Sequence, residues 1–421
     1  MQLDLDTPAA ATLLLLALTG CSSSSQGGST AATRDSAGIR IVDNAQGTWQ
    51  ADQAWTIEAA PLISIAGTAE AELTQIVGAV MRPDGSLAAA SALANAIRFF
   101  DSSGRPAGSL GRPGSGPGEF QALSGVWAAA GDSLVAADVM TQRLTVITPD
   151  GKAGRAYSLG GQSSLTPGEG GRMAFAVPMG ALADGSVVGQ RLSLTVGERR
   201  ESMTRDTVSF IRYAPDGTAA DTIASVPGTE MTQVTVTFGP QTVPIPTPVP
   251  LGKQTVAGIR GAHIFLAQNN SWQVERYRAD GSLDLLIRAP IDAMRLSASD
   301  ISVHRAEWRE MLDAAPQMRA APHQFKTQYL AQLDGIRYPT AMLWIQGLFP
   351  APDGGVWIEE AVRPGIKQRQ FAVVGPDGAL LGRLSTPAGF RLIQVEADRI
   401  LGVWTDDDGL EHVRVHRILK P

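Results

Sequence analysis

Two stretches of this chain share one pattern and decide its fold: VGAVMRPDGSLAAASALANAIRFFDSSGRPAGSLG (77–111) and SGVWAAAGDSLVAADVMTQRLTVITPDGKAGRAYSLG (124–160). Leu134 repeats Leu87 and Ile147 repeats Phe100 with the same offset, a period of roughly 50 residues. Short apolar runs separated by turns at such a period are typical of the four-stranded blades of a β-propeller. The two stretches are therefore predicted to be blades one and two.

The pattern continues to the end of the chain. Further blades are predicted at 180–224, 262–288, 347–384 and 390–419. The sixth of these supplies only three strands, and the apolar segment TIEAAPLISIAG (56–67) is a strand candidate without a partner. An N-terminal strand that completes the last blade would remove the open sheet edge. We therefore expect an all-β fold, a six-bladed β-propeller closed by an N-terminal strand.

The dipeptide Asp-Gly separates the predicted strands. It occurs at 84/85, 150/151, 184/185, 216/217, 280/281, 353/354, 377/378 and 408/409, against roughly three occurrences expected from the composition. Asp-Gly suits type I′ hairpin turns, in which both central residues need positive φ. We interpret these aspartates as turn residues, mostly between the first and second or the third and fourth strands of a blade, and not as catalytic groups.

Two segments do not follow the blade pattern. Residues 231–253 are rich in Pro and Thr and are predicted to form an irregular or extended crossover, because Pro donates no ladder hydrogen bond. Residues 297–335 have a helical pattern in which Ser297 and Asp300 can form an N-terminal cap pair. We expect a helical hairpin, inserted between blades four and five, that lies over one mouth of the ring.

The N-terminus indicates export. An apolar run of signal-peptide length ends at Leu18-Thr19-Gly20-Cys21, which resembles a bacterial lipobox, although the first residues carry no Lys or Arg. Residues 1–21 are thus predicted to be a lipoprotein signal, with Cys21 as the lipidated residue, and 22–50 a flexible tether and lead-in. The propeller would span 51–420. The alternative is a buried strand or helix that carries an incidental cysteine.

Composition limits the partners. The formal net charge is −6 and the pI is about 5.5, so no basic field favours a nucleic acid. We expect a monomer whose only membrane contact is the lipid anchor, at the outer membrane or the periplasmic face of the envelope. The single cysteine excludes an intramolecular disulfide, and the His residues show no metal-ligand spacing. No cofactor is predicted, although distant blades could still assemble a Ca²⁺ or Zn²⁺ site in the channel.

Candidate ligand contacts lie in the helical insertion. His304, Arg305, Trp308 and Arg309 fall within two helical turns, and Trp with Arg is enriched at binding hot spots. Trp308 could instead anchor the helix to the propeller. Asp138, at the end of a predicted strand, could line the channel, or it could hydrogen-bond backbone amides of its own turn.

Other groups are weaker candidates. Gly114, Gly116 and Gly118 lie between two blades and lack the capped helix that a phosphate cradle needs. His412, Arg414 and His416 alternate with valines and are predicted to form a solvated stripe, since positions i and i+4 of a strand lie too far apart to share one metal ion.

A family resemblance supports the fold. The segment LVAADVMTQRLTVITPDG (134–151) resembles an NHL repeat, and GRPGSGPGEF (111–120) resembles the Gly-rich link between NHL blades. Over 38–420 the order of features is similar to six-bladed propeller lipoproteins of soil bacteria. The pattern departs in blade one, where Ser91 stands in the place of Asp138. The resemblance implies a fold and an envelope location but no particular reaction.

Two functions are compatible with the sequence. The first is a non-enzymatic binding or scaffold module that holds an envelope protein, a peptide or a glycan. The alternative is a propeller enzyme, a lyase, lactonase or other hydrolase, with a metal in the central channel. The missing pattern of acidic and histidine ligands favours the binding module.

Overall fold

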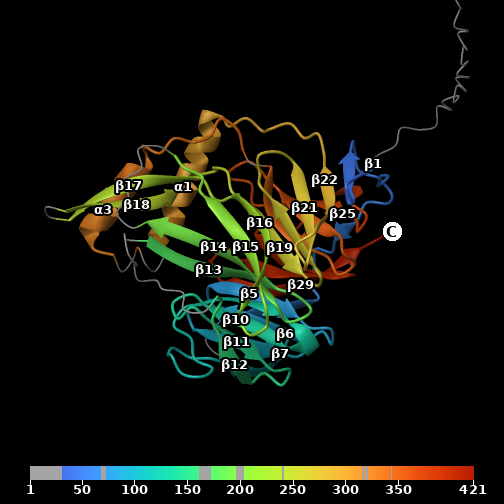
Figure 1. Ribbon diagram of the computed structural model, residues 1–421, viewed down its shortest axis with the longest axis horizontal. Coiled ribbons are helices and arrows are strands. Elements are labelled where there is room, and N and C mark those ends of the chain that lie inside the picture. Colours follow the sequence, from blue (N-terminus) through green and yellow to red (C-terminus); the bar gives the residue numbers. More distant parts are fainter. Residues whose placement is uncertain are drawn as a thin grey trace, which may run out of the picture.

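The computed structural model describes residues 31–67, 73–160, 172–195, 203–238, 241–314, 318, 321–342 and 344–421. Six antiparallel sheets surround a central axis and form a six-bladed β-propeller (Figure 1). Blades one to three contain β5 (Ile76–Met81), β6 (Leu87–Ser91), β7 (Ala96–Phe100), β8 (Pro106–Leu110); β9 (Leu123–Ala128), β10 (Leu134–Asp138), β11 (Arg143–Ile147), β12 (Ala153–Tyr157); β13 (Arg172–Ala181), β14 (Val187–Thr195), β15 (Thr207–Tyr213) and β16 (Ala219–Pro227). A short 3₁₀ helix, η1 (Ala130–Asp132), lies between β9 and β10.

The remaining blades follow in chain order. They contain β19 (Val256–Arg260), β20 (His263–Ala267), β21 (Gln273–Arg278), β22 (Leu283–Arg288); β23 (Ile345–Pro350), β24 (Val356–Glu360), β25 (Gln370–Val374), β26 (Leu380–Ser385); β27 (Phe390–Val395), β28 (Arg399–Thr405) and β29 (Glu411–Leu419). The first strand of each blade is innermost, and apolar side chains from adjacent blades pack against each other to form the core.

The repeat seen in the sequence is a repeat of strand register. Leu87 pairs with Phe100 across β6 and β7, and Leu134 pairs with Ile147 across β10 and β11. All four side chains are buried. The offset between blades one and two therefore relates equivalent core positions, as predicted.

The N-terminal segment closes the ring. β4 (Ile63–Ala66) pairs with residues 412–415 of β29, and β3 (Thr56–Ile57) pairs with the end of the same strand. Ile65 enters the core between blades six and one. On the inner side, the amide of Gln394 accepts a hydrogen bond from Met81 N (2.9 Å) and donates one to Met81 O (3.0 Å), which joins β27 to β5. The predicted closure by residues 56–67 is thus confirmed.

The Asp-Gly turns differ from the expected type. Each of their glycines has positive φ, for example Gly85 at 84° and Gly217 at 90°, but none of their aspartates has. Gly85 N donates to Arg82 O, and Asp84 Oδ1 accepts Ser86 N at 2.8 Å. The prediction of type I′ turns is therefore wrong, because only the glycine of each Asp-Gly pair is left-handed. The geometry instead fits a type I turn followed by a left-handed glycine, with the carboxylate stabilising the amide two residues on.

A second hairpin joins the outside of the ring. β1 (Ala31–Ser36) pairs with β2 (Ile39–Asn44), and β2 pairs in parallel with β22 of blade four. Val42 is buried, and Asn44 donates to Gly378 O and accepts from Leu380 N of blade five. Part of the segment that the sequence placed in the tether and lead-in is therefore ordered sheet. Cys21 and the signal lie outside the described residues.

The Pro- and Thr-rich segment is a regular hairpin, and the predicted irregular crossover is wrong. β17 (Met231–Phe238) pairs with β18 (Gln241–Pro248). Pro244, Pro246 and Pro248 alternate along β18, opposite Thr235, Gln233 and Met231. Thr235 N donates away from β18, to a helix, so these are positions at which neither strand needs an N–H for the ladder. Prolines spaced by two residues are therefore compatible with pairing.

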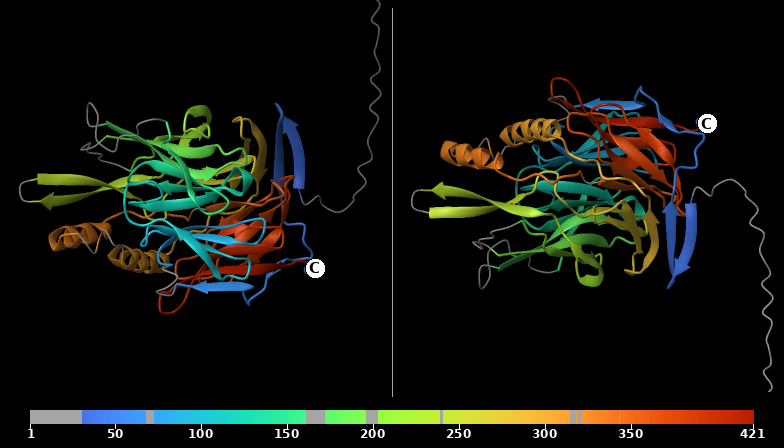
Figure 2. Two further views of the ribbon diagram at one scale, coloured as in Figure 1. Left: turned by 90° about the horizontal axis from the view of Figure 1, so that it is seen from below. Right: turned by 90° about the horizontal axis from the view of Figure 1, so that it is seen from above.

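Two helices lie between blades four and five, as predicted. They are α1 (Ala298–Ala314) and α3 (His323–Leu333). Ser297 and Asp300 form the expected cap, because Asp300 N donates to Ser297 Oγ and Ser297 N donates to Asp300 Oδ2 (2.8 Å). α3 packs along β17, and β17, β18 and α3 together form a projection that we call the arm (Figure 2). The arm and β1 lie at opposite ends of the molecule.

Candidate functional site

The topology gives the propeller two different faces. Turns between the first and second and between the third and fourth strands of a blade lie on one face, which we call the turn face. Links between blades and turns between the second and third strands lie on the other, the connector face. The arm and α1 both belong to links between blades, so they lie on the connector face.

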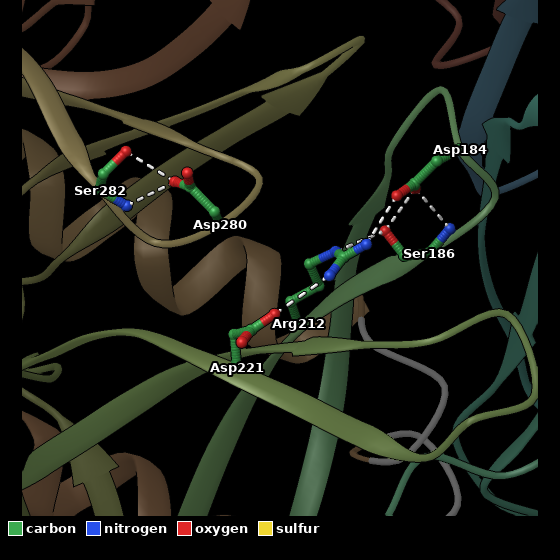
Figure 3. A network of polar contacts seen from close by, with 6 residues as sticks. All are labelled: Asp184, Ser186, Arg212, Asp221, Asp280 and Ser282. Carbon is green, nitrogen blue, oxygen red and sulfur yellow. Dashed lines mark hydrogen bonds and ion pairs between the residues drawn. The ribbon is translucent and has the colours of Figure 1, made fainter.

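Several polar groups on the turn face bind other groups of the fold, although two guanidinium nitrogens of Arg82 are buried there without a hydrogen bond. Arg212 of β15 binds Asp184 (2.7 Å), Ser186 Oγ (3.1 Å) and Asp221 (3.0 Å), as Figure 3 shows. In the adjacent blade Asp280 accepts hydrogen bonds from the amide and hydroxyl of Ser282. These contacts lower the pKa of both Asp184 and Asp280, although partial burial opposes the shift at Asp184. The carboxylates of Asp184 and Asp280 are thus occupied by neighbouring groups of the fold.

The channel mouth on the turn face contains a cross-link between two blades. Arg260, at the end of β19, binds Val395 O and the carboxylate of Glu396, and Gln394 donates to the same carboxylate. β19 belongs to blade four and β27 to blade six, so the contact crosses the mouth. A cavity of about 540 Å³ lies here, lined also by Arg82 and Arg399. Arg399 is paired with the adjacent Asp398 at 2.9 Å.

The larger cavity, about 700 Å³, lies on the connector face. α1 forms one wall with His304, Glu307, Trp308 and Met311. Blades five and six form the opposite wall and the floor with Gln346, Arg363, Ile366, Lys367, Arg369, Arg391 and Asp406. Side chains from one helix and two blades therefore converge on one space.

The cations of this cavity differ in how they are held. Arg363 binds Asp300 of the α1 cap at 2.5 Å, Arg369 binds Glu359 at 2.9 Å, and Arg391 donates to Ile76 O at 2.7 Å. Lys367 makes no ion pair with any residue that the structure describes. Three guanidiniums are thus fixed in place, whereas the ammonium of Lys367 can turn toward a ligand.

A buried carboxyl lies behind this wall. The side chain of Glu359 is 15% exposed, and burial raises its pKa, while Arg369 and then Arg391 oppose the shift. The carboxylate of Glu359 is the group that holds the Arg369 guanidinium at the cavity. The ion pair with Glu359 therefore orients Arg369, at some cost in desolvation.

One histidine lines the cavity, and a second contacts a lining residue. His304 Nδ1 lies 3.1 Å from the hydroxyl of Tyr338, and burial lowers the pKa of His304, opposed by Glu307. On the opposite side His412 Nε2 lies 3.0 Å from Asp406 Oδ2, and this contact is the main reason why the pKa of Asp406 is lowered. The ring of His412, on the same blade, therefore occupies one carboxylate oxygen of Asp406.

The predicted ligand residues separate into three places. His304 and Trp308 line the connector-face cavity. Arg305 and Arg309 instead face α3, where they lie 3.8 and 2.7 Å from Asp334. Asp138 is 2% exposed and accepts hydrogen bonds from the amides of Gln121, Met140 and Thr141, so it lies inside its own blade. The structure brings two of the five residues together.

The structure also tests two weaker candidates from the sequence, the Gly-rich link and the stripe that contains His416. In the Gly-rich link between blades one and two, the carboxylate of Glu119 accepts a hydrogen bond from the backbone N–H of Gly116 (2.8 Å). A side chain of the protein itself therefore occupies the loop that was considered as a phosphate cradle. The solvated stripe is wrong for His416, which is 0% exposed, because the segment between β3 and β4 covers it. Its Nδ1 donates to Glu58 O (2.8 Å), and its ring meets Phe390 edge-on.

The sequence did not single out the loop at 361–369, between the second and third strands of blade five. It carries Arg363, Ile366, Lys367 and Arg369, and it faces α1 across the cavity. A faint signal is present, since this loop has no Asp-Gly and places an isoleucine beside a lysine between two strands of a blade. Blade repeats alone do not show which second-to-third turn faces an insertion.

Two absences are stated for the described ranges only. No group of three or more His, Cys, Asp or Glu side chains there is placed to hold a metal ion. No helix in the same ranges is long and apolar enough to cross a membrane.

Known proteins resemble this chain in the arrangement of the backbone and not in sequence. Neither a protein-family model nor a curated protein sequence matches the chain. A solved Bacteroides fragilis protein assigned as exported matches at 12% identity, with a TM-score of 0.47, over 90% of this chain and 99% of its own. The calcium-binding protein regucalcin from Agrobacterium tumefaciens matches at 12% identity and a TM-score of 0.37, over 88% and 96%. Virginiamycin B lyase from Staphylococcus aureus matches at 9% and 0.38, over 87% and 100%. The likeness is one of fold alone.

Proposed function

We propose that this propeller is a binding module that holds its ligand in the connector-face cavity, between α1 and blades five and six. One observation carries the proposal: Met311, which is 59% exposed, and Ile366, which is 55% exposed, meet at one cavity with the unpaired cation of Lys367. Apolar side chains grouped at a hollow and bordered by charge are typical of interaction sites.

The size and construction of the cavity support this role. Its volume of about 700 Å³ lies within the range of ligand pockets, roughly 300–1,000 Å³. Its walls are fixed by ion pairs at Arg363 and Arg369 and by the cap of α1. A pre-formed site loses less entropy when a ligand binds.

Site-specific photo-crosslinking in cells that express the protein tests this proposal. A photoreactive residue in place of Met311 should give a covalent adduct, whereas the same residue in place of Asp132, at the turn-face cavity, should give none. Adduct formation at Asp132 alone, or at neither position, would contradict the proposal. The mass and chemistry of the adduct also distinguish a protein, a peptide and a glycan.

We further propose that the module is exported and lipid-anchored through Cys21, at the outer membrane or the periplasmic face, and that its blades are NHL-like. The lipobox, the Ser/Gly-rich residues after Cys21 and the Asp138 turn of blade two support this. Detergent partitioning tests the anchor. Wild-type protein should enter the detergent phase and Cys21→Ser should stay in the aqueous phase, and equal partitioning would exclude the anchor.

A further inference from the structure

We propose that the ligand of the connector-face cavity is an acidic peptide segment that also carries apolar side chains. This inference rests on the proposed function and names the class of ligand for the same site. It depends on three features of the cavity: its charge, the chemistry of its apolar wall, and the state of the neighbouring strand edges.

Charge is the first feature. Four cationic side chains line the cavity, and Glu307 and Asp406 are the carboxylates among the lining residues. Asp406 is already engaged by His412. On the blade wall Arg369 is paired with Glu359, so Lys367 and Arg391 are the lining cations that have no ion pair with a described residue. Carboxylates are the groups that such a wall binds through charge-assisted hydrogen bonds.

The apolar wall is the second feature. Besides the aromatic rings of Trp308 and Phe390, of which Phe390 is only 1% exposed, its apolar side chains are aliphatic or thioether groups: Leu251, Met311, Met342, Val362 and Ile366. Methionine adapts to irregular apolar partners and is common at peptide-binding surfaces. A sugar ring would instead need exposed aromatic faces, and α1 supplies one such residue, Trp308. The wall thus favours the apolar side chains of a peptide over a glycan.

The strand edges of the arm are the third feature. Gln328 and Gln332 of α3 bind the outer edge of β17, since Thr237 N and Thr235 N donate to their side-chain oxygens at 2.8 Å. Their amide nitrogens donate back to the carbonyls of the same two threonines. On β18, Pro244 and Pro246 lack the N–H that an added strand would use. The described residues of the arm next to the cavity therefore have their strand edges blocked, which favours recognition by side chains over strand addition at this site.

Fluorescence anisotropy with three labelled peptide pools tests the inference on the full mature chain. The pools combine Gly with Glu and Leu, with Lys and Leu, or with Glu and Ser. We expect the Glu/Leu pool to bind, the Lys/Leu pool not to bind, and the Glu/Ser pool to bind about tenfold more weakly, because it lacks apolar burial. A polyuronate, an acidic glycan of similar charge, serves as competitor and should not displace the Glu/Leu pool.

Surface variants show where the pool binds. Lys367→Glu should weaken binding about tenfold or more, and Ile366→Ser about fivefold, because they remove charge and apolar contact. Lys152→Glu is the matched control: Lys152 is 79% exposed in a turn of blade two and should leave binding unchanged. Tighter binding of the Lys/Leu pool, displacement by polyuronate, or an unaffected Lys367→Glu would overturn the inference. If no pool binds while the adduct at Met311 persists, the site stands and the peptide class is wrong.

Discussion

The two faces of this propeller use the same six blades in opposite ways. On the turn face, the turns are short, their glycines adopt positive φ, and charged groups such as Arg212 and Arg260 bind neighbouring groups, with Arg82 as an exception. On the connector face, the chain adds a hairpin and two helices, and it leaves Met311, Ile366 and Lys367 facing a cavity. The two faces therefore differ in what the chain adds to the blades, and the proposed binding function depends on the additions to the connector face.

The largest expected effect concerns the ring, which both faces share. Ile65→Asp would place a carboxylate in the core between blades six and one and remove the apolar contact of the closing strand. We expect the free energy of unfolding to fall by about 3–5 kcal/mol. Urea denaturation monitored by tryptophan fluorescence measures the change.

Ser64→Asp is the control for this prediction. Ser64 lies in the same strand on the opposite, exposed side, and its hydroxyl already accepts a hydrogen bond from Arg414 at 3.1 Å. A new carboxylate there can pair with Arg414, so stability should change little. If Ile65→Asp unfolds at the same urea concentration as Ser64→Asp, β4 does not close the ring.

The next prediction separates two reasons why a turn position requires glycine: a positive φ, and a lack of space for a Cβ atom. Gly217 has a φ of 90°, and an added Cβ would lie 2.2 Å from Ser158 O of the preceding blade. Gly131, at 61°, has no atom within 4 Å of an added Cβ. Gly217→Ala should therefore lower stability by about 2–4 kcal/mol, and Gly131→Ala by about 1 kcal/mol from backbone strain alone.

Thermal unfolding of both variants, together with binding of the Glu/Leu pool, makes this a test of the two faces. The destabilised Gly217→Ala protein should bind the pool like wild type at a temperature where it is folded. Equal stability of the two variants would show that turns of one blade do not pack on the next. Weakened binding by folded Gly217→Ala would show that the faces are coupled.

The sequence was sufficient for the ring because blade structure is local and repeated. The apolar pairs at 87 and 100 and at 134 and 147, the Asp-Gly turns and the unpaired strand at 56–67 each predicted a real element. The turn type was wrong, since the sequence cannot show that Asp84 keeps negative φ while Gly85 alone is left-handed. The β17–β18 hairpin of the arm was missed because its three prolines alternate onto the edge that needs no hydrogen bond.

The candidate site was only partly predictable for a physical reason. His304 and Trp308 could be selected from one helix, because helical spacing shows which residues are neighbours. Arg305 and Arg309, one position further round the helix, pair with Asp334 instead. Lys367 and Ile366 come from a loop that is distant in sequence, and only the folded ring places it opposite α1.

The smallest expected effect compares two histidines, one in the ring and one at the cavity. Burial lowers the pKa of His416 below its ordinary value of 6.5, and the cation of Arg414 adds to this, while Glu58 opposes it. The unfolded chain therefore takes up a proton near pH 6.5 that native His416 refuses. Stability from this group is fully present above pH 6.5 and is lost as the pH falls below it, by at most about 1.4 kcal/mol per pH unit.

His416→Phe should remove that part of the dependence of stability on pH. His304→Phe should remove less of it, because His304 borders an open cavity beside Glu307, which opposes the lowering of its pKa. Urea midpoints measured from pH 7 to pH 5 decide between them, with the exposed His323→Phe as the control that should keep the wild-type slope. A steeper dependence on His304 than on His416 would mean that the cavity wall, and not the ring, sets the acid stability of this propeller.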